Sequence, residues 1–227
     1  CLIALLPASG PRAKNTLNMQ AKQVCIQGLG FVGAAMAVAV ASVRSKKNQP
    51  LYQVTGVDLP TPDGITRVDA INRGVFPFAT LDRELQSAVA MVSAAGNLRA
   101  TTDESVYESA DIVIVDVALD IPFLAEEPQL QMSGFENAIR AVVSRVPSGA
   151  LVLVETTLPP GTCEKIILPI LRSELRRRGM DERSVHLAHS FERVMPGDAY
   201  LDSIINSWRG YAGDTRAAAD ACEAFLS

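Results

Sequence analysis

Three glycines at positions 28, 30 and 33 are the first residues whose spacing could serve chemistry. They follow the β-type run KQVCIQ and precede the small-residue run AAMAVAVASV of residues 34–43. In a strand–turn–helix unit, Gly28 would allow the tight turn, Gly30 would let a pyrophosphate approach the backbone, and Gly33 would let the helix pack close to the strand. Free N–H groups at the start of such a helix attract phosphate. The pattern indicates a dinucleotide site, although this spacing alone is a weak signal.

The apolar stretch that contains these glycines, from Leu29 to Val43, has two further interpretations. It could span a membrane, but it is about 15 residues long where a spanning helix needs about 20. Three basic residues, Arg44, Lys46 and Lys47, follow it closely. It could also be an ordinary buried helix of a globular core. Both alternatives stay open until the rest of the chain is considered.

An acidic residue stands where a dinucleotide site needs one. The run LYQVTGVD is typical of a second buried strand and ends in Asp58. A carboxylate at this strand end accepts hydrogen bonds from the adenosine ribose and repels a 2′-phosphate, so NAD is favoured over NADP. The alternative is a solvated turn residue ahead of Pro60.

The rest of the chain alternates between strand and helix patterns. Apolar, β-branched runs predict strands near 97–101, 111–117, 150–155 and 184–189, as in a buried parallel sheet. Helices are predicted near 65–73, 81–95, 133–146, 162–178 and 215–226. This order predicts an α/β fold with a doubly wound, mostly parallel sheet, that is, a Rossmann-like NAD-binding domain. We expect the domain to cover residues 22–227 and residues 1–21 to be a leader segment.

Composition and charge argue against several classes of protein. The 227-residue chain has a net charge of −4 and 5% aromatic residues, whereas nucleic-acid binders show a basic face and stacking aromatics. Its four cysteines have no metal-like spacing and no nearby histidine, so we expect no metal site. The N-terminal run CLIALLP is too short to span a membrane, and we expect no membrane association. This cysteine usage fits a reduced, cytoplasmic compartment.

Six short motifs occur in a fixed order along the chain. They are VCIQGLGFVG, VTGVD, INRGVFPF (71–78), ADIVIVDV (110–117), ETTLPPGTCEKII (155–167) and FERVMPG (191–197). This series resembles the NAD-binding domain of the UDP-glucose/GDP-mannose dehydrogenase family over about residues 22–225. The resemblance implies an oxidoreductase that converts the C6 alcohol of a nucleotide sugar to a carboxylate, using NAD in two successive steps. It also implies that the full-length protein is a homodimer.

The resemblance assigns cofactor contacts position by position. Five residues match the family's pyrophosphate loop: Gly28, Gly30, Phe31, Val32 and Gly33. Asp58 matches the ribose acid. Val117 and Ala118 fall beside the cofactor, in VDVALD, where family members usually have a Thr-Pro pair. Glu155 is expected at the carboxyl edge of the sheet, where ligands bind in such folds.

Two residues match family positions with catalytic roles. Thr157 matches the threonine that positions the reacting centre and a water, and its alternative role is to satisfy backbone groups at the strand end. Glu192 matches the acid near the sugar-binding loop, and its alternative role is a structural ion pair with a neighbouring arginine. Glucose-type members have a second glutamate where this chain has Pro196. The form ERVMPG is more similar to members that act on N-acetylated nucleotide sugars.

The family's nucleophilic cysteine, with its lysine and asparagine, lies C-terminal to the matched region. We therefore expect these residues beyond Ser227, and we expect this chain to lack the central and C-terminal substrate domains and to be inactive alone. Cys163, in GTCEK at a helix start, is the alternative nucleophile that needs testing. Cys25 and Cys222 are expected to be core residues.

Two other functions remain open from the sequence. A hydroxyacid-type NAD-dependent dehydrogenase has a similar glycine turn, although ETTLPPGT argues against that group. A non-catalytic NAD-binding or interaction module is favoured only by the missing nucleophile region. Oxidation of a simple 3-hydroxy acid would support the former.

Overall fold

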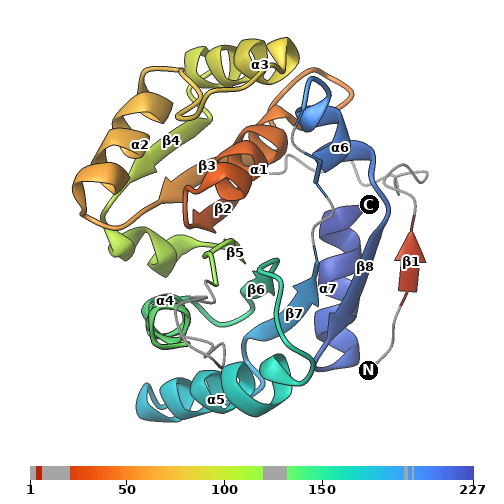
Figure 1. The fold of residues 1–227 in the computed structure, drawn as a ribbon. Helices are drawn as coiled ribbons and strands as arrows, with labels where there is room; N and C mark the ends of the chain where they lie inside the picture. Colours follow the sequence, from red (N-terminus) through yellow and green to blue (C-terminus); the bar gives the residue numbers. More distant parts are fainter. Residues whose placement is uncertain (1–3, 7–20, 120–131, 192–193, 196) are drawn as a thin grey trace, which may run out of the picture.

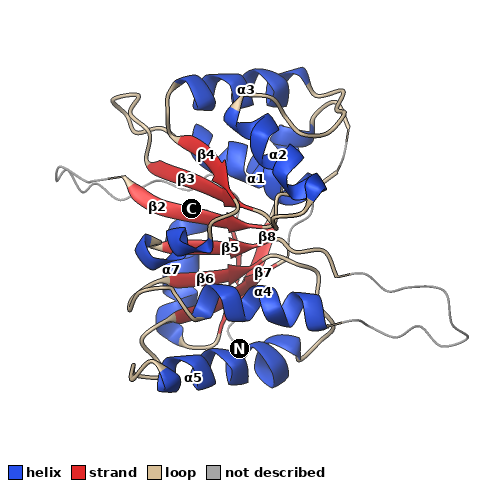
Figure 2. Ribbon diagram, turned by 90° about the vertical axis from the view of Figure 1, so that its left-hand side faces the viewer, coloured by secondary structure: helices blue, strands red, loops and turns tan. Residues whose placement is uncertain are grey.

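Eight strands of the described chain form one mixed sheet in the order β1-β8-β7-β6-β5-β2-β3-β4. The computed structural model describes residues 4–6, 21–119, 132–191, 194–195 and 197–227. The strands run parallel from β4 to β7, while β8 is antiparallel to both β7 and β1. Figures 1 and 2 show helices on both faces of the sheet. The predicted doubly wound, mostly parallel α/β fold is confirmed.

The strands are short, and those at the centre are apolar on both faces. Their bounds are β1 Ala4–Leu6, β2 Lys22–Gln27, β3 Tyr52–Val57, β4 Leu98–Thr101, β5 Ile112–Val115, β6 Leu151–Val154, β7 His186–Ser190 and β8 Arg209–Gly213. Every residue of β5 and β6 is buried. Strands covered by helices on both faces need such continuous apolar runs.

The helices divide between the two faces of the sheet. Their bounds are α1 Phe31–Ser42, α2 Pro62–Asn72, α3 Arg83–Ala94, α4 Ser133–Val143, α5 Leu168–Arg177, α6 Tyr200–Asn206 and α7 Arg216–Leu226. One apolar cluster joins the sheet to α1, α2, α3, α6 and α7. A second joins the opposite face to α4, α5 and the 3₁₀ helix η1, Glu104–Ser109. Helices therefore cover both faces of the sheet.

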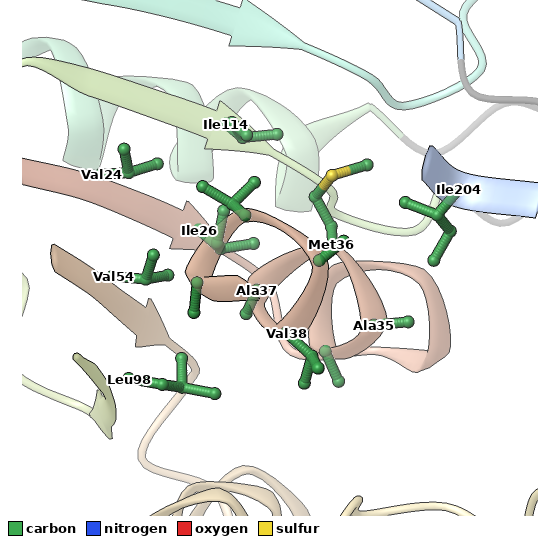
Figure 3. Packing of buried hydrophobic residues seen from close by; sticks show 14 of the residues in the cluster. Val24, Ile26, Ala35, Met36, Ala37, Val38, Val54, Leu98, Ile114 and Ile204 are labelled. Carbon is green, nitrogen blue, oxygen red and sulfur yellow. The ribbon is translucent and has the colours of Figure 1, made fainter. Parts of the chain in front are cut away.

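Helix α1 is the apolar stretch that the sequence left open to three interpretations. Its residues Gly33–Ala41 are all buried, and a helix that is apolar all round must be surrounded by protein or lipid. Here it packs on β2 and β3 and against α3 and α6, and Figure 3 shows Met36 and Ala37 beside Ile26. Alanines allow this close approach. Within the described ranges, no helix is long and apolar enough to cross a membrane.

The structure differs from the sequence-based expectations in four places. Ala4–Leu6, inside the expected leader of residues 1–21, form β1 on β8, because the outer edge of β8 offers backbone groups to an extended segment. Helix α6 and strand β8 were not predicted. The helix expected over 162–178 begins with a π-helical turn, η2 (Cys163–Ile167), and continues as α5, with Pro169 in the first turn of α5.

Candidate functional site

A cleft of about 1050 Å³ opens at the carboxyl ends of β2, β3, β5 and β6. The strand order reverses at β2, whose neighbours are β3 and β5, and ligands of such sheets bind outside this switch point. The cleft is lined by nearly all the predicted cofactor residues of the described chain: Gly28, Gly30, Phe31, Val32, Asp58, Val117, Ala118, Glu155 and Thr157. The topology therefore brings together residues from four strand ends.

The glycine loop joins β2 to α1 at the centre of this cleft. Gly28 has φ +95°, and a Cβ there would lie 2.7 Å from the Asp116 carbonyl oxygen. A Cβ on Gly33 would lie 2.0 Å from the Gly28 carbonyl oxygen, so only glycine lets the helix approach the loop. A Cβ on Gly30 would meet no atom within 4 Å. The protein thus leaves open space in front of Gly30, as a bound pyrophosphate requires.

The first turn of α1 faces the cleft with its backbone N–H groups. Its N-cap is Gly30, which provides no side-chain cap, and the first turn contains no acidic residue. The leading N–H groups of a helix lack intrahelical partners, and the helix dipole adds partial positive charge there. Phosphate oxygens can accept hydrogen bonds from these N–H groups, and the partial positive charge attracts their negative charge.

Asp58 lies at the end of β3 and is tied to Arg67 on α2. The guanidinium donates from Nε to Oδ2 at 2.7 Å and from Nη2 to Oδ1 at 3.2 Å, and the Leu59 amide donates to Oδ1 at 2.8 Å. Asp58 is only 8% exposed, so it is not a solvated turn residue. These contacts hold the carboxylate at the position that a ribose acid occupies in such folds. Arg67 also lines the cleft, and the sequence reasoning missed it.

The end of β5 forms the wall opposite Asp58. Val117 is half-buried, Ala118 is exposed, and both line the cleft. Asp116 lines it too, with its Cβ 3.1 Å from where a Cβ on Gly33 would stand. An acidic side chain therefore lies beside the glycine loop, where the sequence reasoning had considered only the two residues that follow it.

The two adjacent threonines in the turn after β6 differ in their surroundings. Thr156 is buried, and its hydroxyl lies 2.9 Å from the Val117 carbonyl oxygen and 3.3 Å from that of Val115. Thr157 is exposed on the cleft wall. Thr156 thus satisfies the backbone groups that had been considered for Thr157, and Thr157 is the exposed threonine that lines the cleft.

Glu155 lies beneath this turn and is fully buried. Its Oε1 accepts a hydrogen bond from Arg209 Nη1 at 2.6 Å, and the arginine side chain is 11% exposed. Arg209 also donates to the Ile204 carbonyl at the end of α6. A buried carboxylate needs such a partner. The pair joins the Thr156–Thr157 turn to β8 and α6, two elements that the sequence patterns missed.

Four aromatic rings connect the glycine loop to the start of α6. Phe31 stacks on Tyr200 with ring centroids 4.7 Å apart, and it makes edge contacts with Phe76 and Phe78. Tyr200 begins α6 and donates from its hydroxyl to the Phe31 carbonyl oxygen. Glu192 itself lies outside the described residues, so its predicted role stays a prediction.

Burial favours the neutral forms of one histidine and three cysteines of the described chain. His189 Nε2 lies 3.3 Å from the Thr156 carbonyl oxygen, and burial lowers the pKa of His189 below its usual value. Burial raises the pKa of Cys163 to about 11 and the pKa values of Cys25 and Cys222 to about 12. These thiols therefore stay protonated near neutral pH, and the expected packing roles of Cys25 and Cys222 are confirmed by their burial.

The chain belongs to the UDP-glucose/GDP-mannose dehydrogenase family, because the profile of that family's NAD-binding domain matches residues 22–218. The cofactor of this domain is NAD. The residues present fit it: the helix start can hold the pyrophosphate, the space at Gly30 is open, and Asp58 is positioned for a ribose.

Two curated relatives and one solved structure are similar to this chain. The chain is 30% identical over 187 residues to UDP-N-acetyl-D-mannosamine dehydrogenase of Pyrococcus horikoshii, and 33% identical over 188 residues to that of Escherichia coli K12. These matches cover 82% and 81% of this chain and 40% of each relative. The solved NDP-N-acetyl-D-galactosaminuronic acid dehydrogenase of Methanosarcina mazei Go1 superposes with a TM-score of 0.79 at 27% identity, covering 91% of this chain and 42% of that one. The chain thus spans about 40% of the length of its curated relatives.

Proposed function

We propose that this chain is the cofactor-binding part of an enzyme that oxidises the C6 alcohol of a nucleotide sugar to a carboxylate. The observation that carries the proposal is the convergence of the open glycine loop, the paired Asp58 and the exposed Thr157 on one cleft. The overall reaction is RCH₂OH + H₂O + 2 NAD⁺ → RCOO⁻ + 2 NADH + 3 H⁺. The alcohol loses four electrons, and water supplies the second carboxylate oxygen.

The roles proposed for the chain's own residues follow from their places. The start of α1 would bind the pyrophosphate, and Asp58 would accept hydrogen bonds from the ribose. Thr157 would donate its hydroxyl hydrogen to the C6 oxygen or hold the hydrolytic water. Glu192 would assist proton transfer or hold the sugar. The buried Glu155–Arg209 pair would fix the turn that presents Thr157.

The covalent step of such a reaction needs a thiolate. The raised pKa of Cys163 argues against that residue as nucleophile, because a thiol with a pKa of about 11 is almost fully protonated at neutral pH. We therefore propose that the cysteine, lysine and asparagine of the covalent step come from a part of the protein beyond Ser227. We further propose a homodimeric, cytoplasmic enzyme.

An N-acetylated nucleotide sugar is the substrate class that we favour. The relatives from Pyrococcus horikoshii and Escherichia coli are named for UDP-N-acetyl-D-mannosamine. Pro196 also stands where glucose-type members have their second glutamate. The first point comes from the relatives and the second from the sequence. Together they support N-acetylated nucleotide sugars as the substrate class.

The test is NAD reduction by the product of the complete reading frame against a panel of UDP- and GDP-sugars. We expect two NADH for each N-acetylated nucleotide sugar consumed. One NADH from a simple hydroxy acid, with no response to nucleotide sugars, would instead indicate a hydroxyacid dehydrogenase. Absence of turnover with every sugar, despite NAD binding, would indicate a non-catalytic module.

A further inference from the structure

A buried amide at the floor of the cleft has no role in the site described so far. Gln27 is the last residue of β2, directly before Gly28, and it is 5% exposed. Gln27 is one of the residues that line the cleft. Among the residues that the structure describes, its Oε1 atom has no hydrogen-bond partner. Buried polar atoms are normally paired, so this one calls for a partner that the described residues do not supply.

The surroundings of Gln27 are apolar on both sides. In the sheet it is in register with Val57 of β3 and Val115 of β5, and both valines belong to the apolar cluster on the α4 face. Cys25 belongs to the same cluster, and side chains two residues apart on a strand point to the same face. Gln27 therefore also points to the α4 face. An amide in such a setting destabilises the protein when it has no partner.

The position of Gln27 indicates which part of a dinucleotide it meets. The next residue after Val57 is Asp58, whose carboxylate we place at the adenosine ribose. Across the cleft, α4 contributes Phe135, Ala138 and Ala141, an apolar wall suited to a flat base. The amide thus lies between the ribose acid and the wall that would cover the adenine.

We propose that Gln27 is a cofactor-contact residue whose Oε1 accepts a hydrogen bond from the adenosine half of NAD. The donor is the exocyclic amino group of adenine or a ribose hydroxyl. This inference rests on the proposed cofactor site in the same cleft. It gives a role to a polar side chain whose neighbours in the sheet are apolar. Binding would then satisfy an atom that the described part of the chain leaves buried without a partner.

The test compares Gln27→Leu with a matched control, Tyr107→Phe. Tyr107 is fully buried in the same apolar cluster, its hydroxyl also lacks a partner within the described residues, and it does not line the cleft. Each substitution removes one unpaired polar group, so both variants should melt at the same temperature as the unmodified chain or higher. Only Gln27→Leu should weaken NAD binding, by about fivefold in calorimetry. Gln27→Met is a second variant in case leucine does not fit.

A second dinucleotide identifies the donor. Nicotinamide hypoxanthine dinucleotide has a carbonyl in place of the adenine amino group. If the amino group is the donor, this analogue binds the unmodified chain more weakly than NAD, and Gln27→Leu binds both alike. If Gln27→Leu weakens both dinucleotides equally, the donor is a ribose hydroxyl and the contact stands.

The inference and the cofactor site can fail separately. Unchanged or tighter NAD binding by a folded Gln27→Leu, with the same result for Gln27→Met, would overturn the role of Gln27. Absence of NAD binding by the unmodified chain would instead reject the cofactor site.

Discussion

Replacing Gly30 and Gly33 by alanine should separate cofactor binding from folding within one loop. The two glycines are three residues apart, yet their surroundings differ sharply. A Cβ on Gly33 would lie 2.0 Å from the Gly28 carbonyl oxygen and 3.1 Å from the Asp116 Cβ. A Cβ on Gly30 would meet no atom within 4 Å. Gly33 is thus required by the protein, and Gly30 is required only by a ligand.

The magnitudes follow from these contacts. Overpacking costs about 1–3 kcal/mol, and a clash with backbone places Gly33→Ala near the upper end, about 3 kcal/mol. For Gly30→Ala, alanine is a poorer N-cap by up to about 1 kcal/mol, and the stiffer unfolded chain offsets about 0.4–1 kcal/mol. The net change in the free energy of unfolding should therefore stay within about 0.5 kcal/mol. The added methyl group should still weaken NAD binding at least tenfold, or about 1.4 kcal/mol.

Thermal melting and calorimetric titration with NAD are the two assays. Gly33→Ala should lower the melting temperature by about 6–12 °C, and Gly30→Ala should leave it nearly unchanged while its NAD affinity falls. A stable Gly33→Ala, or a Gly30→Ala that binds NAD normally, would refute the reasoning.

Four further substitutions test other parts of the site. Asp58→Ala should weaken NAD binding about tenfold and reduce discrimination against NADP, because it removes the ribose acid and frees the Arg67 guanidinium for a phosphate; unchanged titration curves for both cofactors would exclude this role. Thr156→Val should cost about 1–2 kcal/mol of unfolding free energy, whereas Thr157→Val should change it by less than about 0.5 kcal/mol and impair turnover by the complete protein; equal losses of stability would contradict the division of roles. Because the pKa of His189 is lowered in the folded protein, the unfolded chain takes up a proton at a higher pH than the folded chain does. The free energy of unfolding should therefore decrease as the pH falls below about 6.5 and be regained above that pH. Denaturant titrations of the unmodified chain and His189→Gln should show a smaller decrease in the variant, and identical pH profiles would argue against this contribution.

The central part of the fold could be predicted from the sequence, because its elements are long or strongly apolar. The glycine turn, the buried α1 and the strands β2 to β7 all follow from hydrophobic pattern. Helix α6 has only seven residues, and β8 reads RGYAG, with too few β-branched residues to indicate a strand. These two elements form through tertiary contacts, including the Arg209–Glu155 pair.

Site residues could be predicted from the sequence where the residue type and its position together indicate one role. The glycine spacing and Asp58 indicated the loop and the ribose acid, and both line the cleft. Arg67 could not be assigned, because its pairing with Asp58 depends on the direction of α2. The division between Thr156 and Thr157 depends on which hydroxyl reaches the carbonyls of β5 and of the residues after it. In the sequence, Gln27 is recognisable as a polar residue at the end of a strand whose preceding residues are apolar.

The most direct test of the central claim is to locate NAD on the ¹⁵N-labelled chain by nuclear magnetic resonance. The account predicts saturable shifts, with a single affinity, at the backbone amides of Phe31, Val32 and Gly33, together with Leu59 and Thr157. Phe31, Val32, Leu59 and Thr157 line the cleft, and Gly33 follows Val32 in the first turn of α1. Saturable shifts confined to a different surface, or no shifts in a folded chain, would contradict it.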